Sequence, residues 1–252
     1  MKLQESVNKL ISAAQKEADR YTYPIFKSDF REKPDLIATS VIVRANDKHY
    51  LITASHVMEH FITAGSPFMI GVNEQYVSIE GEFILSNHES KDHFDIAYTV
   101  LPAITIKNHT ITALSSKQLV VDNSFVNVPV AFIHGFPNSR NKQFKSLLNT
   151  MSFKVNAYAY AGIIINNFQH WEDTEKSTEL HTCMTYDKKS GGNSPPSPKG
   201  VSGGGLWIVP DLSNPLNIQL DSIFIEYHKQ YAVTFSTKIS QIMSFINSTG
   251  GV

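Results

Sequence analysis

Gly200-Val201-Ser202-Gly203-Gly204-Gly205 is the stretch that decides how this chain is interpreted. A single hydroxyl side chain stands among glycines, and glycine reaches the backbone conformations that a tight turn requires. The apolar residues 206–209 follow at once and read as a strand. The stretch therefore predicts a small polar side chain, Ser202, held on a tight turn beside a strand.

Outward from this motif, short apolar segments alternate with turn residues. The first two segments form a hairpin around Ala45-Asn46-Asp47-Lys48. Many short strands of this kind are typical of barrels or sandwiches. The candidate strands are residues 36–43, 49–53, 68–72, 75–79, 82–85, 95–101, 125–133, 148–155, 159–165, 181–186, 206–209, 218–227 and 231–235.

The two ends of the chain show helical rather than strand spacing. Apolar residues recur every three or four positions in residues 7–18 and again in residues 239–246. Ser6 and Ser236 precede these patterns and are the expected N-caps. We expect one helix at each end of the chain.

Two upstream segments supply the partners that a serine nucleophile needs. Thr53-Ala54-Ser55-His56 offers His56 as the base, and Asp95-Ile96-Ala97 offers Asp95 to orient the imidazole. Asp92 is the other candidate for this role, but Asp95 is favoured because Ile96-Ala97 continue a buried strand. The backbone N–H groups of Gly200 and Ser202 would stabilise the developing oxyanion. The order His, Asp, Ser is one of the linear orders in which hydrolytic triads occur.

At these three motifs the chain resembles the chymotrypsin-like (trypsin-like) serine peptidases. Gly135-Phe136-Pro137 resembles a segment of their bacterial, disulfide-poor branch. The resemblance covers residues 36–247 and implies an all-β fold of two antiparallel six-stranded β-barrels, with the triad in the cleft between them. It divides the chain into an N-terminal helical extension (1–30), a first barrel (31–118), and a second barrel with the C-terminal helix (119–252).

The chain departs from the digestive members of that family before the nucleophile. They carry an aspartate there that pairs with a freed N-terminus, whereas this chain has Val201. Activation by that salt bridge is therefore not expected. The resemblance also places residues 223–227 beside the substrate pocket, where Glu226 would favour Lys or Arg if it faces the pocket rather than solvent.

Three alternatives compete with the serine endopeptidase reading. The Gly-x-Ser-x-Gly pattern also fits the nucleophile elbow of α/β-hydrolases, and Asp211, Asp221 and His228 follow it. However, too little chain remains for that fold, and the region upstream lacks its alternating strands and helices. His56-Val57-Met58-Glu59-His60 fits an inverted zinc-peptidase motif without a visible third ligand. A catalytically silent barrel that binds peptides or partners is the third, because a fold does not guarantee activity.

Composition limits the class and the surroundings of the protein. Charged residues make up 18% of the chain and the net charge is −1, which gives no signal for nucleic acid or a membrane surface. The only cysteine, Cys183, is expected to be buried and excludes an internal disulfide. With no apolar leader in the N-terminal segment, we expect a cytoplasmic enzyme that needs no metal or cofactor. Its partners would be protein or peptide substrates and a regulatory protein that restrains it.

Overall fold

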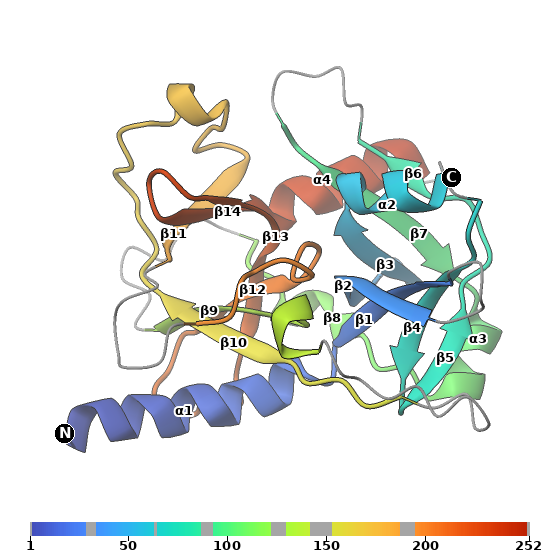
Figure 1. The fold of residues 1–252 in the computed structure, drawn as a ribbon, viewed down its shortest axis with the longest axis horizontal. Coiled ribbons are helices and arrows are strands. Elements are labelled where there is room, and N and C mark those ends of the chain that lie inside the picture. The colour runs from blue at the N-terminus through green and yellow to red at the C-terminus, as the bar shows by residue number, and fades with distance from the viewer. Residues whose placement is uncertain are drawn as a thin grey trace.

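The computed structural model describes residues 2–28, 34–62, 65–86, 93–121, 130–141, 153–186 and 195–250. Within these residues the chain is mostly β, with antiparallel sheets that include a half-barrel, and four α-helices (Figure 1). The helices are α1 (Lys2–Ala18), α2 (Ser55–Ile62), α3 (Ala103–His109) and α4 (Ile239–Gly250), and three short 3₁₀ turns span Ser116–Gln118, Asn138–Arg140 and Glu172–Thr174.

The first sheet is built from the N-terminal half of the chain. Its strands run in the order β5-β4-β1-β2-β3-β7-β6, and β8 pairs in parallel with β2. Their bounds are β1 (Thr22–Ser28), β2 (Pro34–Ala45), β3 (Lys48–Ala54), β4 (Phe68–Val72), β5 (Gln75–Ser78), β6 (Ile84–Leu85), β7 (Ile96–Leu101) and β8 (Leu114–Ser115).

The predicted first hairpin is confirmed. Asn46 and Asp47 connect β2 to β3 with φ values of 49° and 57°. A two-residue turn with positive φ at both positions matches the twist of the flanking strands, and Asn and Asp tolerate this conformation. The pairing that follows fixes the end of β3, where the first candidate site residue lies.

The second sheet is built from the C-terminal half and has the order β10-β9-β12-β13-β14-β11. A single bridge between Ile164, just after β10, and Met184 in β11 joins the two ends of this order. The sheet is therefore rolled so that its edges meet. The strand bounds are β9 (Val130–Gly135), β10 (Tyr158–Gly162), β11 (His181–Thr185), β12 (Gly205–Val209), β13 (Gln219–His228) and β14 (Val233–Lys238).

Several expected boundaries differ from those observed. The first sheet has eight strands instead of six, partly because β1 lies inside residues 1–30, which were expected to form a helical extension. The two expected N-caps are wrong, since α1 already begins at Lys2 and Ser236 still belongs to β14. Residues 125–129 and 148–152 of two candidate strands lie outside the described residues.

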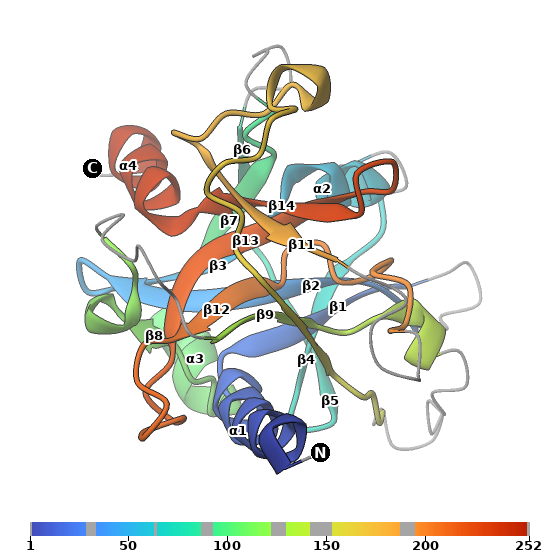
Figure 2. The ribbon, with the colours of Figure 1, turned by 90° about the vertical axis from the view of Figure 1, so that its left-hand side faces the viewer.

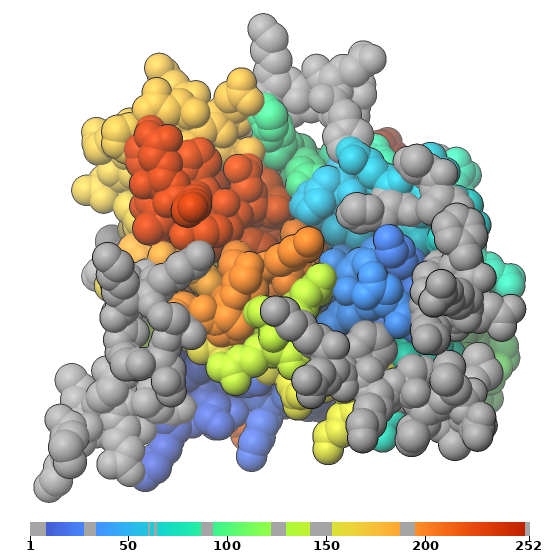
Figure 3. Space-filling model, in the orientation of Figure 1, coloured from blue at the N-terminus to red at the C-terminus, as the bar shows by residue number. Residues whose placement is uncertain are grey.

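The helices α1 and α4 pack on opposite parts of the molecule (Figures 1 and 2). Helix α1 lies beside β9 and β10, and its residues Ala14 and Ala18 are fully buried. Helix α4 packs on β13 and β14 through Ile242 and Ile246. Both helices thus use their apolar stripes to cover the sheets. Figure 3 shows residues of the second half, in orange, meeting the blue and cyan residues of the first half along one border.

Candidate active site

The end of β3 and the start of β7 bring His56 and Asp95 together. His56 is the second residue of α2, and Asp95 directly precedes β7, which pairs with β3. His56 Nδ1 lies 2.6 Å from Asp95 Oδ2. Asp95 Oδ1 also accepts hydrogen bonds from the His56 amide at 2.9 Å and from the Ser55 hydroxyl at 3.0 Å. These contacts hold the imidazole in one orientation, with Nε2 pointing away from the carboxylate.

Opposing effects act on the two titratable groups. Burial lowers the pKa of His56, but the hydrogen bond to Asp95 and the charges of Asp95, Glu59 and Glu226 outweigh it, so the pKa of His56 is raised. Burial raises the pKa of Asp95, and its hydrogen bonds to His56 and Ser55 reverse this, so the pKa of Asp95 is lowered. The pair therefore consists of an ionised carboxylate and an imidazole that gains a proton more readily than usual.

The glycines around Ser202 have backbone conformations that the site requires. Gly200 has φ of 92°, and a Cβ atom there would lie 2.0 Å from Asn138 Oδ1. Gly203 has φ of 85°, and a Cβ atom there would lie 2.2 Å from Thr53 Oγ1. Any larger residue at either position would meet both a steric clash and a strained conformation. The motif is thus a turn that is folded tightly against the first sheet.

The backbone amides of the motif divide into two sets. Val201 donates to the Pro198 carbonyl, Gly203 to the Phe224 carbonyl and Gly204 to the Val201 carbonyl. Within the described part of the chain, the amides of Gly200 and Ser202 have no acceptor. Two free N–H groups separated by one residue on a tight turn are the kind of donors that can bind an anion. These are the two amides that the sequence singled out.

The turn that carries Ser202 packs against the end of β3, the strand that leads into His56. The position of a Cβ atom on Gly203 would be 3.0 Å from the Cα atom of Thr53, three residues before His56. In addition, the backbone amide of Thr39 in β2 donates a hydrogen bond to the Ser202 carbonyl at 3.0 Å. No hydrogen bond joins the Ser202 hydroxyl to His56 among the described residues. Such contacts are often long in free enzymes and shorten only when substrate is bound.

Sequence reasoning missed two residues that build this site. The Thr39 hydroxyl donates to the Gly200 carbonyl at 2.9 Å and accepts the Phe136 amide at 3.1 Å, so it links the two sheets beneath the motif. Ser55 supplies a third hydrogen bond to Asp95. Only the position of Ser55 directly before His56 could have drawn attention to it. Nothing in the local sequence distinguishes Thr39 from other strand threonines.

Glu226 lies in β13 and has a partner of its own. Its Oε2 atom is 3.0 Å from Lys176 Nζ, and the Lys176 side chain is only 4% exposed while that of Glu226 is 45% exposed. The charge of Glu226 contributes to the raised pKa of His56, so the carboxylate lies within electrostatic range of the His56–Asp95 pair. Because Lys176 offsets part of that charge, the expected preference for Lys or Arg stays a prediction.

The structure also bears on the competing interpretations. The sheets around the motif are antiparallel, whereas the nucleophile elbow of α/β-hydrolases requires a parallel sheet. His56 and His60 do share α2, but Nδ1 of His56 faces Asp95. Among the side chains that the structure describes, which exclude His60 and Asp92, no three His, Cys, Asp or Glu residues gather as metal ligands.

Cys183 is buried as expected, and burial raises the pKa of its thiol to about 12.

The described residues contain no helix that is long and apolar enough to cross a membrane.

Comparisons with known proteins give a fold and no family. No protein-family model matches the chain, and no curated protein is similar to it in sequence. Among solved structures, 172 chains match it. One comes from a study of how aromatic interactions drive the coupled folding and binding of the intrinsically disordered Sesbania mosaic virus VPg protein. It aligns over 91% of this chain and 90% of that chain, with a TM-score of 0.50 and 11% identity. At this identity the likeness shows the fold alone.

Proposed function

We propose that this protein is a serine endopeptidase of the chymotrypsin-like type, in its bacterial, disulfide-poor form. In this proposal the two sheets are the two barrels of that fold. His56 and Asp95 come from the first barrel and Ser202 comes from the second. The substrate is a protein or peptide, and no metal or cofactor takes part.

One observation carries the proposal: the turn with two unpaired amides packs against the end of β3, the strand that leads to an oriented His–Asp pair. Three hydrogen bonds to Asp95 fix the imidazole, and the amides of Gly200 and Ser202 point to no other acceptor in the described chain. A structural role alone would not require free backbone donors, since buried amides are nearly always paired.

The reaction follows from this arrangement. Ser202 Oγ attacks the peptide carbonyl while its proton passes to His56 Nε2, and the carbonyl oxygen becomes an oxyanion held by the Gly200 and Ser202 amides. The C–N bond then breaks, and His56 returns the proton to the leaving amine. Water, deprotonated by the same imidazole, releases the acyl group and restores Ser202. Asp95 stabilises the imidazolium in both halves of the reaction.

The cellular compartment and the regulation of the enzyme are also part of the proposal. We place the enzyme in the cytoplasm, because its one cysteine is buried and no disulfide supports the fold. A peptidase in that compartment needs narrow specificity or a regulatory protein partner. The described end of the loop before the motif is tied down, since Tyr186 donates to the Pro196 carbonyl and the Asn138 amide donates to the Lys199 carbonyl. Residues 187–194 of that loop lie outside the described residues.

Labelling with a fluorophosphonate probe tests the proposal directly. The native chain should be labelled covalently, and Ser202→Ala should not be, while both unfold at the same temperature. Ser244→Ala removes an exposed hydroxyl on α4 and serves as the matched control that keeps full labelling. A folded native chain that resists the probe would reject the enzyme and favour the silent, peptide-binding barrel.

A further inference from the structure

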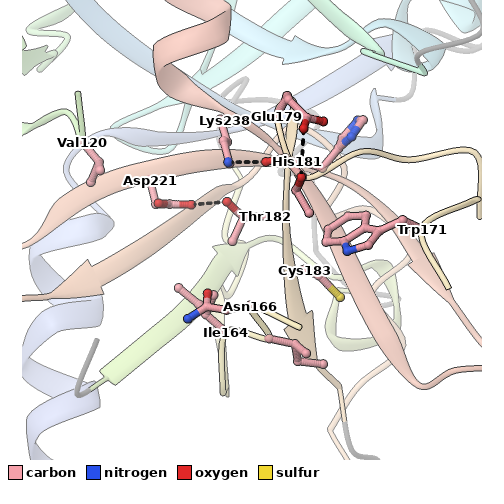
Figure 4. A pocket seen from close by; sticks show the side chains of 12 residues that line it. Val120, Ile164, Asn166, Trp171, Glu179, His181, Thr182, Cys183, Asp221 and Lys238 are labelled. Carbon is pink, nitrogen blue, oxygen red and sulfur yellow. Dashed lines mark hydrogen bonds between the residues drawn. The ribbon is translucent and has the colours of Figure 1, made fainter. Parts of the chain in front are cut away.

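A cavity of about 390 Å³ opens beside β11, β13 and β14, on the second sheet (Figure 4). None of His56, Asp95 and Ser202 lines it. The volume is at the lower end of the range for small-molecule sites, so it suits a free small molecule better than a peptide segment.

One end of the cavity is polar and carries more negative than positive charge. Asp221 and Glu179 contribute carboxylates, and Lys238 contributes the one ammonium among the lining residues. Lys238 Nζ already donates to the Thr178 carbonyl, and Asp221 Oδ2 accepts the Thr182 hydroxyl at 2.7 Å. Figure 4 shows these side chains grouped on one side of the cavity. Burial raises the pKa of Asp221 in spite of the Thr182 hydroxyl and the charge of Lys238, so a further cation beside this carboxylate would stabilise its ionised form.

His181 also lines this end of the cavity, and protein groups lie beside both of its ring nitrogens. Nδ1 lies 3.2 Å from the Ser177 amide nitrogen and 3.3 Å from the Ser177 carbonyl oxygen. Nε2 lies 3.2 Å from the His93 carbonyl oxygen. Besides this imidazole, the charged groups that line the cavity are two carboxylates and one ammonium.

The other end of the cavity is mostly apolar, with the Asn166 side chain beside Ile164 (Figure 4). Trp171, Ile164 and Cys183 line it, and the Cys183 thiol stays protonated at neutral pH because burial raises its pKa to about 12. The Trp171 ring is the one aromatic face among the lining residues. An indole face attracts cations as well as apolar groups.

We propose that this cavity is a second ligand site that binds a small amphipathic amine. Its ammonium would lie against Asp221 and Glu179, and its apolar or aromatic body would pack on Trp171 and Ile164. An anion would meet two carboxylates, and a purely apolar ligand would leave the polar end unpaired.

The walls of the cavity also hold the segment that carries Asp95. His181 binds the His93 carbonyl, and Thr237, the neighbour of Lys238, donates to the Phe94 carbonyl at 2.6 Å. A ligand that orders β11 and β14 therefore also restrains residues 93–95. Binding of the amine does not depend on the proposed peptidase activity. Only an effect of the bound amine on peptide turnover would rest on that proposed function.

Calorimetric titration with three matched probes tests the site. We expect 2-phenylethylamine to bind the full-length chain at least ~10-fold more tightly than 2-phenylethanol, because a charged hydrogen bond contributes about 1.5–3 kcal/mol. Phenylacetate should bind more weakly than either. Equal affinity for the amine and the alcohol, preference for the anion, or binding only by a lysine-containing peptide would overturn the proposal.

Variants locate the binding to this cavity. Asp221→Asn should weaken the amine by about 10-fold and leave the alcohol unchanged. If that variant does not fold, Glu179→Gln at the rim gives the same comparison with a smaller loss. Asp211→Asn, an exposed carboxylate that only caps its own turn, is the control. Hydrogen exchange of residues 93–97 should slow when the amine saturates the Ser202→Ala protein, and unchanged exchange would remove the link to Asp95.

Discussion

Replacing Asp95 by asparagine tests the catalytic pair most sharply, because the structure dictates how the new amide must turn. The carboxylate accepts from the Ser55 hydroxyl and the His56 amide on Oδ1, and it faces His56 Nδ1 with Oδ2. Asparagine has one acceptor oxygen and one NH₂ group. It can satisfy the first pair of donors or the imidazole Nδ1–H, but not both.

The first orientation is the more stable one. With the amide oxygen toward Ser55 and the His56 amide, both of those hydrogen bonds remain, and the NH₂ group donates to Nδ1. With the amide reversed, the His56 N–H faces an NH₂ group and loses its acceptor, which costs about 1–3 kcal/mol. The favoured orientation forces the hydrogen onto Nε2, and His56 can then no longer accept the serine proton.

The loss of the negative charge adds to this tautomer effect. Asp95 contributes the largest effects that raise the pKa of His56 against burial, so the imidazolium of the transition state also loses most of its stabilisation. Together we expect acylation to fall by ~10⁴, about 5 kcal/mol, with little change in folding.

The assay is the second-order rate of fluorophosphonate labelling at pH 8, with thermal unfolding measured in parallel. Asp211→Asn serves again as the control, since its carboxylate accepts only from Ser213 at the surface. A labelling rate for Asp95→Asn within ~10-fold of the native rate would refute the assigned role of Asp95.

Four further predictions follow from the same site. His56→Ala should abolish labelling as completely as Ser202→Ala, because triad members act as a unit; appreciable labelling of either variant would contradict the mechanism. The rate should rise with pH as His56 loses its proton, with a midpoint above the ordinary value of ~6.5 because its pKa is raised, and the lowered pKa of Asp95 keeps that carboxylate ionised throughout; a rate that falls from pH 6 to 8 would exclude His56 as the base. Gly200→Ala should reduce acylation by more than ~10-fold and destabilise the fold by about 1–3 kcal/mol. Gly65→Ala is the control, since Gly65 also has positive φ but nothing lies within 4 Å of its Cβ position, and acylation should stay unchanged. Equal effects of the two variants on acylation would show that the conformation of the Gly200 turn is not required for acylation. EDTA should not inhibit, and restoration of a chelated enzyme by zinc would instead favour the His56–His60 motif.

Much of the fold follows from local sequence because its signals are local. The Asn46-Asp47 turn and the alternating strands that flank it specify a hairpin on their own, and β2 and β3 form as predicted. The N-cap predicted at Ser236 was wrong because pairing between distant segments decides the structure there. Ser236 is a good N-cap in isolation, but its backbone is already paired with Thr182 in the sheet, and tertiary pairing overrides local preference.

The chemical identities of the candidate site could be predicted from spacing and residue type. Short motifs proposed His56, Asp95 and Ser202 as the site, and the glycines at 200 and 203 indicated the positive φ that the turn adopts. These motifs can be recognised from local sequence, since few roles other than a tight turn or a reactive site require this combination of residues.

What only the tertiary structure decided is how these residues are held. Thr39 supports the turn across more than 160 positions of sequence, and Lys176, which lies before β11, pairs with Glu226 in β13. The amphipathic cavity beside Asp221 likewise combines residues that lie far apart in the sequence, from Val120 to Lys238. Hydrogen bonds and burial between segments far apart in the sequence leave no periodic pattern in it, so they appear only once the chain is folded.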